Sequence, residues 1–421
     1  MEAALDKAKQ YEWFALKLLP MIDQGWLMSP FYLFTILVLF SYGLIFLWVG
    51  YYNHRNNTFS GDPVLVDCEK YFSILIPFRD EAHNLGKLIE ALGGLNFPKT
   101  QFEVLFIDDH SQDDGAKILE KIRPSVRFSM EIISLSKPEK FGKKQAILQG
   151  IQKAKHPWII TLDADSIPTE DWLQSIERTL SSTSAEFITG PVFLNAEKGL
   201  LFQLQATEFM ALQALTRASF NLRPLLSNGT NLAYSKTIFE AVEGFSGNLN
   251  ISSGDDMFLM RKIWRQKKWA MAYNMDWSGA VQTTASQNWA TYAAQQLRWM
   301  SKTSALKDPL LTFLAFIVLC TNALMAFWIV ICWAAVLALF PESAYQLILF
   351  TAIIFSLKFI VDHLCLWASY AHLDRETAWS WRKINWPVQL LAALIYPFWS
   401  LGLAMVSVIY KPHWKGRKIQ L

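Results

Sequence analysis

The chain has 421 residues, of which 52% are hydrophobic, 14% aromatic and 18% charged. It is richer in apolar side chains than an ordinary soluble protein, and it is long enough for one large domain plus membrane helices. The net charge of +3 is too small to favour nucleic acid as a partner. The four cysteines form no CxxC pair, which argues against a disulfide framework or a zinc site.

The chain opens with two segments of different polarity. Residues 1–30 mix Trp, Phe and Leu with Lys and Asp, which indicates an amphipathic arm at a membrane surface. Residues 31–52 carry no charge and are long enough to cross ~30 Å of hydrocarbon, so we expect a transmembrane helix. This apolar run starts too far into the chain, is too long and lacks the small-residue cleavage site of a signal peptide.

The C-terminal part predicts a membrane region of about three spans, residues 309–410, followed by a basic tail, residues 411–421. The three apolar runs are 310–340, 345–370 and 387–410. Lys358, Asp362 and His363 fall in the middle of the second run. Ionisable groups at this depth normally face protein, although a lysine can instead extend its ammonium to the membrane surface.

The basic residues give two conflicting orientations. His54 and Arg55 follow the first span, which favours the middle region inside the cell. Three further spans would then place the basic tail outside, against the positive-inside rule. Either one C-terminal segment is re-entrant or doubled, or the tail breaks the rule. Pro397 and the length of the run 310–340 make both places candidates.

Residues 53–308 alternate between short apolar runs and helical patterns. The expected strands are 71–77, 102–107, 131–134 and 158–162, separated by helices around 85–92, 118–122 and 143–153. This alternation predicts an α/β domain with a mostly parallel sheet and right-handed crossovers. Ligands bind such sheets at the carboxyl ends of the strands, and two acidic clusters stand at those ends.

Asp163 and Asp165 directly follow a strand that is buried on both faces. Two carboxylates separated by one small residue suit Mg²⁺ or Mn²⁺, because these ions bridge a few carboxylates and a substrate diphosphate. The alternative is a solvated loop or a helix N-cap, since Ser166 and Asp171 precede a helical stretch.

Asp108 and Asp109 repeat this arrangement after the neighbouring strand. Their carboxylates could bind a base or a ribose, or they could close an Asx turn supported by Ser111. Lys143 opens the next helix, where a cation and free N–H groups attract a diphosphate. The alternative for Lys143 and its neighbour Lys144 is a solvated helix face.

Asp255 and Asp256 begin another helix. Acidic residues in a first turn are favoured by the helix dipole, which is a sufficient structural reason for them. The functional reading is a general base that takes the proton of an acceptor hydroxyl. The turn 228–231 precedes a further strand and could line the same cleft.

Gln295, Arg298 and Trp299 share one face of a helix at the edge of the C-terminal membrane region. An arginine facing a cleft neutralises a leaving diphosphate, and a tryptophan stacks on a sugar. The alternative is an interfacial anchor, with the tryptophan among headgroups and the arginine on a lipid phosphate.

Six segments in a fixed order now carry a specific resemblance. They are Ser73–Glu81, Phe106–Asp113, Gly142-Lys143, Leu162–Asp165, Gly254–Asp256 and Gln295–Trp299. Over about residues 72–300 the chain resembles the family 2 membrane glycosyltransferases, whose catalytic domain has the GT-A fold. The family includes cellulose, hyaluronan and poly-N-acetylglucosamine synthases and ceramide glucosyltransferases.

The resemblance implies a role for each motif. Pro77, Glu81 and Asp109 would hold the nucleoside, with Lys143 near the diphosphate. Asp163 and Asp165 would hold nucleotide and metal, Asp165 being the more direct ligand; Asp256 would be the base; Gln295, Arg298 and Trp299 would steady the diphosphate and the acceptor. The family inverts the anomeric centre by direct displacement.

The chain departs from the family pattern at two positions. His110 and Asp255 stand where the family usually has Gly and Glu. The first departure bears on the nucleotide loop, and the second leaves the base position intact. The four expected spans are also fewer than processive synthases generally use, so single transfer to a lipid stays open beside polymer synthesis.

We therefore expect a Mg²⁺- or Mn²⁺-dependent inverting glycosyltransferase in the cytoplasmic membrane, with its catalytic domain in the cytoplasm. Its donor would be a nucleotide-diphosphate sugar, preferably a UDP-sugar, and its acceptor a lipid or a growing polysaccharide. A catalytically silent subunit of a synthase complex, a transporter and a nucleotidyltransferase are the weaker alternatives. The intact acidic motifs argue against the first, the few spans against the second, and the motif Gln295–Trp299 at a membrane against the third.

Overall fold

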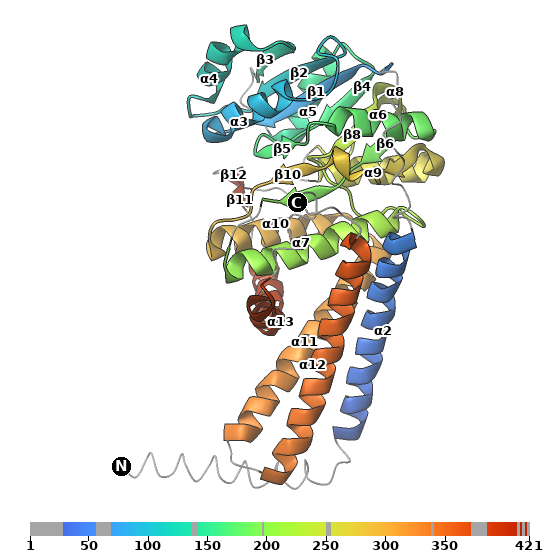
Figure 1. Cartoon of the computed structure of the whole chain (residues 1–421), viewed down its shortest axis with the longest axis vertical. Coiled ribbons are helices and arrows are strands. Elements are labelled where there is room, and N and C mark those ends of the chain that lie inside the picture. The colour runs from blue at the N-terminus through green and yellow to red at the C-terminus, as the bar shows by residue number, and fades with distance from the viewer. Residues whose placement is uncertain are drawn as a thin grey trace.

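The computed structural model describes residues 28–55, 69–135, 142–195, 198–249, 254–337, 341–371 and 385–410, and the pairs 413–414 and 417–418. Most of the expected N-terminal arm and of the basic tail lies outside the described residues. Figure 1 shows three levels along the long axis: a sheet domain, two helices beneath it, and a helical bundle furthest from the sheet. This is the α/β domain with flanking apolar helices that the sequence predicts.

The main sheet has seven strands in the order β3-β2-β1-β4-β8-β6-β9. Their bounds are β1 (Phe72–Phe78), β2 (Phe102–Asp108), β3 (Ser129–Ser134), β4 (Trp158–Thr161), β6 (Phe187–Thr189), β8 (Leu232–Ser235) and β9 (Met271–Tyr273). β1 to β4 are parallel, with Phe72 opposite both Phe102 and Trp158. β8 is antiparallel to β4 and β6. The strands expected from the sequence form the parallel half, and they confirm the α/β assignment.

A small second sheet begins directly after the acidic motif Asp163 and Asp165. It contains β5 (Ser166–Pro168), β7 (Val192–Leu194) and β10 (Val281–Thr283) in the order β5-β10-β7. Ser166 follows Asp165 directly and pairs with Thr283. The two sheets therefore hold the backbone of the acidic motif from both sides.

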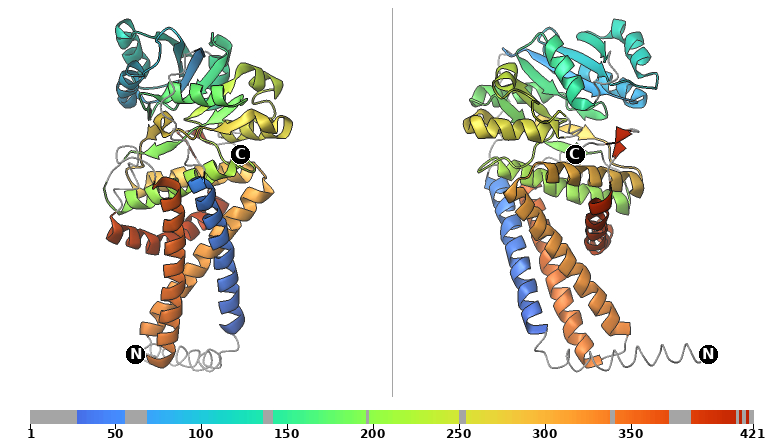
Figure 2. Two further views of the ribbon diagram at one scale, coloured as in Figure 1. Left: turned by 45° about the vertical axis from the view of Figure 1, so that its right-hand side comes forward. Right: turned by 180° about the vertical axis from the view of Figure 1, so that it is seen from behind.

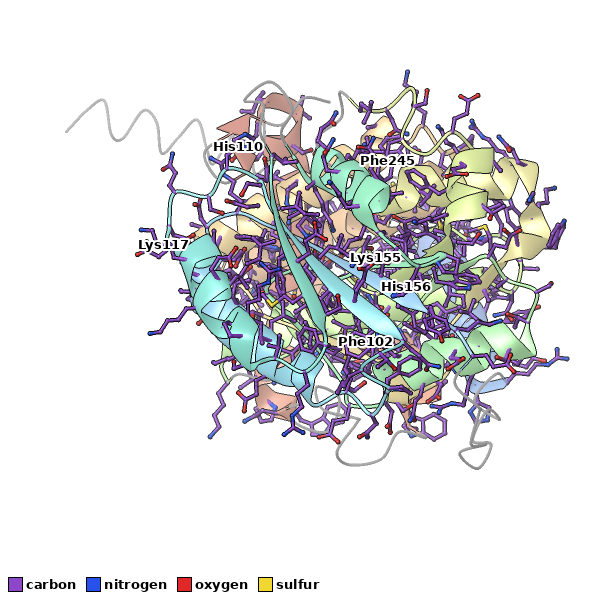
Figure 3. The ribbon with its side chains drawn as sticks, turned by 90° about the horizontal axis from the view of Figure 1, so that it is seen from above. Phe102, His110, Lys117, Lys155, His156 and Phe245 are labelled. Carbon is purple, nitrogen blue, oxygen red and sulfur yellow. The ribbon has the colours of Figure 1, made fainter. Side chains whose placement is uncertain are left out.

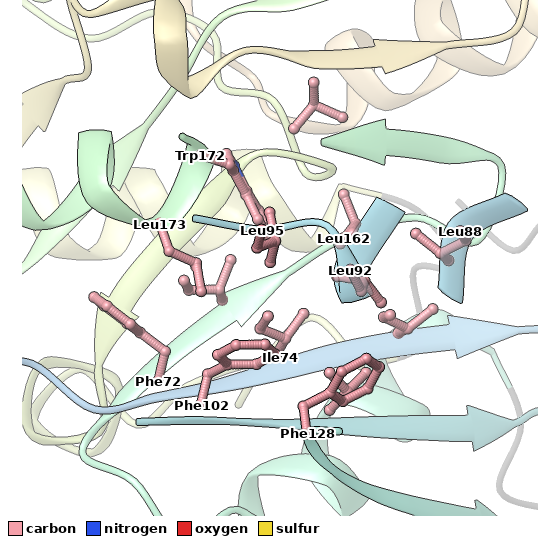
Figure 4. Close-up of a cluster of buried hydrophobic side chains, with 14 of the residues drawn as sticks. Phe72, Ile74, Leu88, Leu92, Leu95, Phe102, Phe128, Leu162, Trp172 and Leu173 are labelled. Atoms are coloured by element: carbon pink, nitrogen blue, oxygen red, sulfur yellow. The ribbon is translucent and has the colours of Figure 1, made fainter. Parts of the chain in front are cut away.

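Helices cover both faces of the main sheet. On one face lie α3 (Ala82–Gly93), α4 (Gly115–Ile122) and α6 (Trp172–Ser182), and on the other α5 (Lys143–Lys153), α8 (Lys236–Ala241) and α9 (Asp255–Gln266). Figure 4 shows Ile74 of β1 among Leu88, Leu92 and Trp172, whereas the next residue, Leu75, packs on the other face. Strands covered on both faces need apolar residues at successive positions, which explains the continuous apolar runs.

Two helices form a platform beneath the sheet domain, α7 (Leu200–Ser219) and α10 (Trp289–Ala305). They lie side by side across the long axis in Figures 1 and 2, and hydrogen bonds between their side chains join them. The helix expected around Gln295–Trp299 is α10. No pattern in the sequence had predicted α7.

The bundle consists of α2 (Met28–Arg55), α11 (Pro309–Leu337) and α12 (Pro341–Tyr370). Trp328 is fully buried at its centre, and its Nε1 donates to Thr35 Oγ1 at 3.0 Å. Large apolar side chains such as Phe34, Phe40 and Phe313 are exposed on its outside. With α13 (Trp386–Ile409), four described helices are long and apolar enough to cross a membrane.

α13 differs from the other three helices in direction. It is seen almost end-on in Figure 1 and runs across the long axis in the left view of Figure 2, under the platform. Thr207 of α7 donates to Gln389 of α13 at 3.0 Å, and Trp399 of α13 stacks on Tyr292 of α10. Beyond α13, the short strands β11 (His413–Trp414) and β12 (Arg417–Lys418) lie level with the sheet domain in Figure 1.

Two of the ionisable residues within α12, Lys358 and Asp362, are paired inside the protein. Asp362 accepts hydrogen bonds from Lys358 Nζ at 2.7 Å and from Tyr42 of α2 at 2.6 Å. His363 Nδ1 lies 2.7 Å from the carbonyl oxygen of Phe359. Lys358 therefore forms a polar cluster within the bundle with Asp362 and Tyr42 and ties α12 to α2.

Candidate active site

The candidate site lies at the carboxyl ends of the parallel strands. Figure 3 shows His110 beyond one end of β2 and Phe102 at its other end. The segments that follow β1, β2 and β4 carry Glu81, Asp109 and Asp163, and α5 begins with Lys143 at the same edge. The topology therefore brings together the motifs that the sequence placed at strand ends.

The loops after β1 and β2 are joined by hydrogen bonds. Gln112 N–H donates to Asp80 Oδ1 at 2.7 Å, and Ala82 N–H donates to Asp113 Oδ2 at 2.8 Å. Asp108 Oδ1 accepts from Ser111 N–H at 2.8 Å, so this carboxylate closes the loop, one residue further along the chain than in an Asx turn. Asp108 thus shapes the loop that presents Asp109.

Asp109 is the buried carboxylate of this edge, with 2% of its surface exposed. Its Oδ2 accepts from Gly142 N–H at 3.0 Å, and its Oδ1 lies 3.2 Å from His110 Nδ1. Burial raises the pKa of Asp109, while His110 and the Gly142 N–H act against this rise. Asp109 therefore links the β2 loop to the start of α5, the segment that carries Lys143.

His110 has a φ of 59°, in the left-handed region that glycine adopts without strain. This conformation explains why glycine suits the position. Histidine is among the residues that tolerate it best, and its ring contacts the neighbouring Asp109. The departure from the family pattern therefore preserves the path of the loop.

Pro77 and Glu81 flank the same edge from β1. Pro77 lies opposite Ile107 near the end of β1 and, unlike most of that strand, is only partly buried. Glu81 precedes α3, and its Oε2 accepts from Asn84 Nδ2 at 2.7 Å. Both residues border the loops that follow β1 and β2.

The centre of the site is a cluster of opposite charges. Lys143 Nζ lies 2.6 Å from Asp163 Oδ1 and 3.4 Å from Asp255 Oδ2. Burial disfavours the Lys143 ammonium, but the two carboxylates outweigh it and raise the pKa of Lys143. The side chain of Asp163 is 40% exposed, so this carboxylate stays open to a ligand.

Arg298 completes the cluster from the platform helix α10. Burial lowers the pKa of Arg298, and the charges of Asp163, Asp165, Asp255 and Asp256 act against this lowering. Both acidic motifs therefore face one guanidinium, although they are far apart in the sequence. An arginine stays protonated at any pH at which the protein is folded.

The turn 228–231 closes the cleft between the acidic motifs. Thr161 Oγ1 donates to the Gly229 carbonyl at 2.8 Å, and Asp163 N–H donates to Thr230 Oγ1 at 3.1 Å. A Cβ on Gly229 would stand 3.2 Å from Lys143 Nζ and 3.4 Å from Asp255 Oδ2. Glycine therefore leaves the Lys143 ammonium room that a larger residue would crowd.

The two acidic motifs differ in their surroundings. Asp256 is 4% exposed, and its Oδ1 accepts from Met257 N–H at 2.8 Å at the start of α9. Asp255 is paired with Lys143. Asp165 Oδ1 accepts from Ser166 Oγ at 3.2 Å. Asp171, the alternative cap residue, precedes α6 without a capping hydrogen bond from its side chain.

The residues expected on the acceptor side lie on α10. Gln295 Oε1 accepts from Ser286 Oγ at 3.3 Å, and the Trp299 ring lies 6.3 Å from that of Phe209 on α7. On the neighbouring face of α10, Tyr292 and Gln296 contact Glu208 of α7. Sequence reasoning missed α7 and Glu208. The available signal was a run of 20 residues, Leu200–Ser219, without glycine or proline.

The carboxylates fit a divalent ion that a substrate shares. Among the described residues, no group of three or more His, Cys, Asp or Glu side chains could hold a metal. Asp163 and Asp165 supply two carboxylates, and Mg²⁺ is normally bound by one or two carboxylates together with substrate phosphates. The donor set therefore suits a metal–diphosphate complex better than a resident metal cage.

Comparisons with known proteins agree with this geometry. Residues 73–242 match the description Glycosyl transferase family 2, and residues 158–410 match Glycosyl transferase family group 2. The second match covers more than half of the chain. The protein therefore belongs to this glycosyltransferase family.

The chain is similar to two named enzymes. Glycosyltransferase AglE of Haloferax volcanii is 29% identical over 185 residues, 44% of this chain and 59% of AglE. Poly-beta-1,6-N-acetyl-D-glucosamine synthase of Staphylococcus aureus is 25% identical over 158 residues, 37% of each protein. The matched region thus spans less than two thirds of either relative.

A solved structure supports the fold. Mannosyltransferase PcManGT of Pyrobaculum calidifontis, solved in complex with GDP-Man and Mn²⁺, aligns with 89% of this chain and 99% of its own chain. The TM-score is 0.56 and the sequence identity 13%. This likeness confirms the GT-A fold expected from the sequence.

Proposed function

We propose that the protein is a membrane-bound, metal-dependent, inverting glycosyltransferase that moves a sugar from a UDP-sugar to a lipid-linked or growing polysaccharide acceptor. One observation carries the proposal: at the edge of the sheet, above the platform and the apolar bundle, Lys143 contacts carboxylates of both acidic motifs, whose charges also act on Arg298. Cations among carboxylates at such an edge suit a metal–diphosphate complex. With the platform beneath this edge, an acceptor would approach from the membrane side.

Each proposed role follows from position. The loops that would enclose the nucleoside are bordered by Asp109, Pro77 and Glu81. Asp108 shapes these loops. Lys143 and Arg298 would neutralise the diphosphate as it leaves. A bound Mg²⁺ or Mn²⁺, held by Asp165 and Asp163, would supply Lewis-acid stabilisation of that leaving group.

Asp256 is the proposed base. The acceptor hydroxyl oxygen bonds to the anomeric carbon while the bond from that carbon to the diphosphate oxygen breaks, and Asp256 takes the hydroxyl proton. Asp255 is engaged by Lys143 and serves to hold that ammonium. Gln295 and Trp299 lie on α10 with Arg298, where the acceptor sugar would lie.

The direction of α13 supports a specific topology. We infer that α2, α11 and α12 cross the membrane, whereas α13 lies in the interface beside the platform. With three crossings, the basic tail lies on the same side as the sheet domain, which satisfies the positive-inside rule. The orientation conflict in the sequence then disappears, with the catalytic domain in the cytoplasm.

Single transfer to a membrane lipid is the second candidate. It is favoured by the small number of crossing helices, since three offer little enclosure for a polymer. The alternative of a silent binding subunit is disfavoured by the complete charged cluster.

Product analysis tests this proposal. Purified protein is given radiolabelled UDP-sugars with Mn²⁺ and total lipid of the expression membranes, and the product is sized and its linkage assigned by NMR. We expect one labelled product with an inverted anomeric centre. Retention of configuration would overturn the mechanism, and the product's size would decide between one sugar and a polymer.

The topology has its own test. A C-terminal epitope tag should be degraded by protease in inside-out membrane vesicles and protected in right-side-out vesicles, as the catalytic domain should be. Opposite protection of the tag and the domain would show that α13 crosses the membrane.

A further inference from the structure

Three consecutive residues of α7 contact α10, α13 or both, the helices near the proposed acceptor side. Thr207 donates to Gln389 of α13 at 3.0 Å. Glu208 accepts from side chains of both α10 and α13. Phe209 lies against Trp299 of α10, with 6.3 Å between the ring centres. This short segment of α7 is therefore one place at which the platform and α13 meet.

Glu208 is the centre of that junction. Its Oε2 accepts from the Tyr292 hydroxyl and from Gln296 Nε2, the latter at 2.7 Å, and its Oε1 accepts from the Tyr396 hydroxyl at 3.2 Å. All three partners donate, and a carboxylate is an acceptor only. The ionised form of Glu208 therefore satisfies the whole set, whereas a protonated carboxyl must give up or reverse one of these bonds.

Through α10, Glu208 is connected to Gln295, Arg298 and Trp299, which we call the acceptor wall. Tyr292 and Gln296 are four residues apart and so lie on one face of the helix. Trp299 is seven residues from Tyr292 and so lies on nearly the same face, whereas Gln295 and Arg298 lie further round the helix, with Arg298 toward the acidic motifs. Hydrogen bonds to Tyr292 and Gln296 hence fix the rotation of α10 about its own axis, which sets where Arg298 and Trp299 point.

We propose that Glu208 is a positioning residue for the acceptor wall, and that its ionisation tightens the contact of α10 with α7 and α13. The inference rests on the proposed function, because it concerns the acceptor side of the same site. Glu208 touches no reacting group; it acts through the orientation of α10.

The charge state of Glu208 changes in the physiological range. Burial raises the pKa of Glu208 to about 7, while hydrogen bonds from Tyr292 and Tyr396 act against the rise. Tyr292 and Tyr396 are the titratable groups that face it from α10 and α13, and beyond Tyr396 lies Asp362 of α12. As pH falls through about 7, Glu208 gains its proton and the junction loosens.

Hydrogen exchange of the purified protein tests the positioning directly and needs no substrate. In Glu208→Gln the amide replaces the carboxylate with one acceptor and one donor. We expect α10 amides to exchange about tenfold faster or more, the change produced by losing one hydrogen bond to a charged group. Tyr396→Phe, which removes one donor and keeps the packing, should give the same change in smaller measure.

Glu103→Gln is the matched control. Glu103 is a buried carboxylate near the start of β2 that accepts from Ser73 and from Lys155 N–H, at the opposite end of the strand from the candidate site. It should alter exchange in β2 and leave α10 unchanged. Wild-type exchange in α10 of both Glu208→Gln and Tyr396→Phe would overturn the proposal, whatever the activity.

Kinetics supply the second readout. With saturating donor and total lipid of the expression membranes as the titrated acceptor, Glu208→Gln should raise the apparent KM for the lipid about tenfold and change kcat by less than about threefold. The wild-type KM should rise as pH falls through about 7, and this rise should be absent in Glu208→Gln. A wild-type pH profile in the variant would overturn the inference, whereas absence of transfer in the wild-type protein would overturn the proposed function alone.

Discussion

Two clusters of lysine and aspartate in this chain stand in different surroundings. In the cleft, Lys143 bridges Asp163 and Asp255, and the side chain of Asp163 remains 40% exposed. In the bundle, Lys358 and Asp362 close on each other and on Tyr42. The first cluster has spare charge facing an opening, and the second is satisfied by its own members. A ligand site therefore differs from a structural ion pair by the exposed charge that it presents to an opening.

The largest effect is expected from Asp256→Asn in the cleft. Removing the proposed base should lower the transfer rate about 10²–10⁴-fold and leave nucleotide affinity nearly intact. Steady-state nucleotide release and calorimetric titration measure the two quantities. Full activity in this variant would remove Asp256 from the role of base.

Asp165→Ala should weaken Mn²⁺-dependent nucleotide binding, by about 10–100-fold, because the metal–diphosphate complex loses a carboxylate. Calorimetry with and without EDTA measures the change. Asp171→Ala is the matched control, since that carboxylate precedes α6 without capping it and contacts Asn96 near the surface. Equal affinities in both variants would refute the metal role of Asp165.

Asp362→Asn tests the other side of the comparison. It leaves the Lys358 ammonium without its counter-ion inside the bundle, and we expect a loss of about 1–2 kcal/mol in stability. Nucleotide affinity should stay at the wild-type level. Thermal unfolding in detergent and calorimetry measure these outcomes. A loss of nucleotide binding at unchanged stability would show that the intramembrane cluster serves the site.

The smallest effect is expected from His110→Gly. Glycine adopts the left-handed backbone of this position without strain, which favours the variant by about 0.5–1 kcal/mol. The loss of the ring contact removes one influence that lowers the pKa of Asp109, so that pKa should rise further. Thermal unfolding and the pH dependence of nucleotide affinity check both expectations. A large loss of stability would show that the ring, and not the backbone, holds the loop.

Much of the sheet domain could be read from the sequence because its signals are local. Strands covered on both faces give continuous apolar runs, and Asp163 and Asp165 stand directly after one of them. The same reasoning placed Asp109 at the same edge. The parallel order of β1 to β4 then follows from the short helices between them.

The platform and the direction of α13 could not be read in this way. α7 buries polar residues such as Gln203, Gln213 and Arg217 against other elements, so its sequence shows no clear apolar face. Mean hydropathy cannot distinguish a helix that crosses a membrane from one that lies along it. The contact of Lys143 with both acidic motifs is long-range and depends on the completed fold.

The central claim is that this cluster performs metal-dependent transfer from a nucleotide sugar at a membrane. The most direct measurement is nucleotide diphosphate release from a panel of UDP- and GDP-sugars by purified protein with membrane lipid, in Mn²⁺ or in EDTA, with Asp256→Asn as background. We expect one donor to give nucleotide diphosphate release above the Asp256→Asn background, and we expect EDTA to abolish this release. Release that is insensitive to EDTA, or no release from any donor, would contradict it.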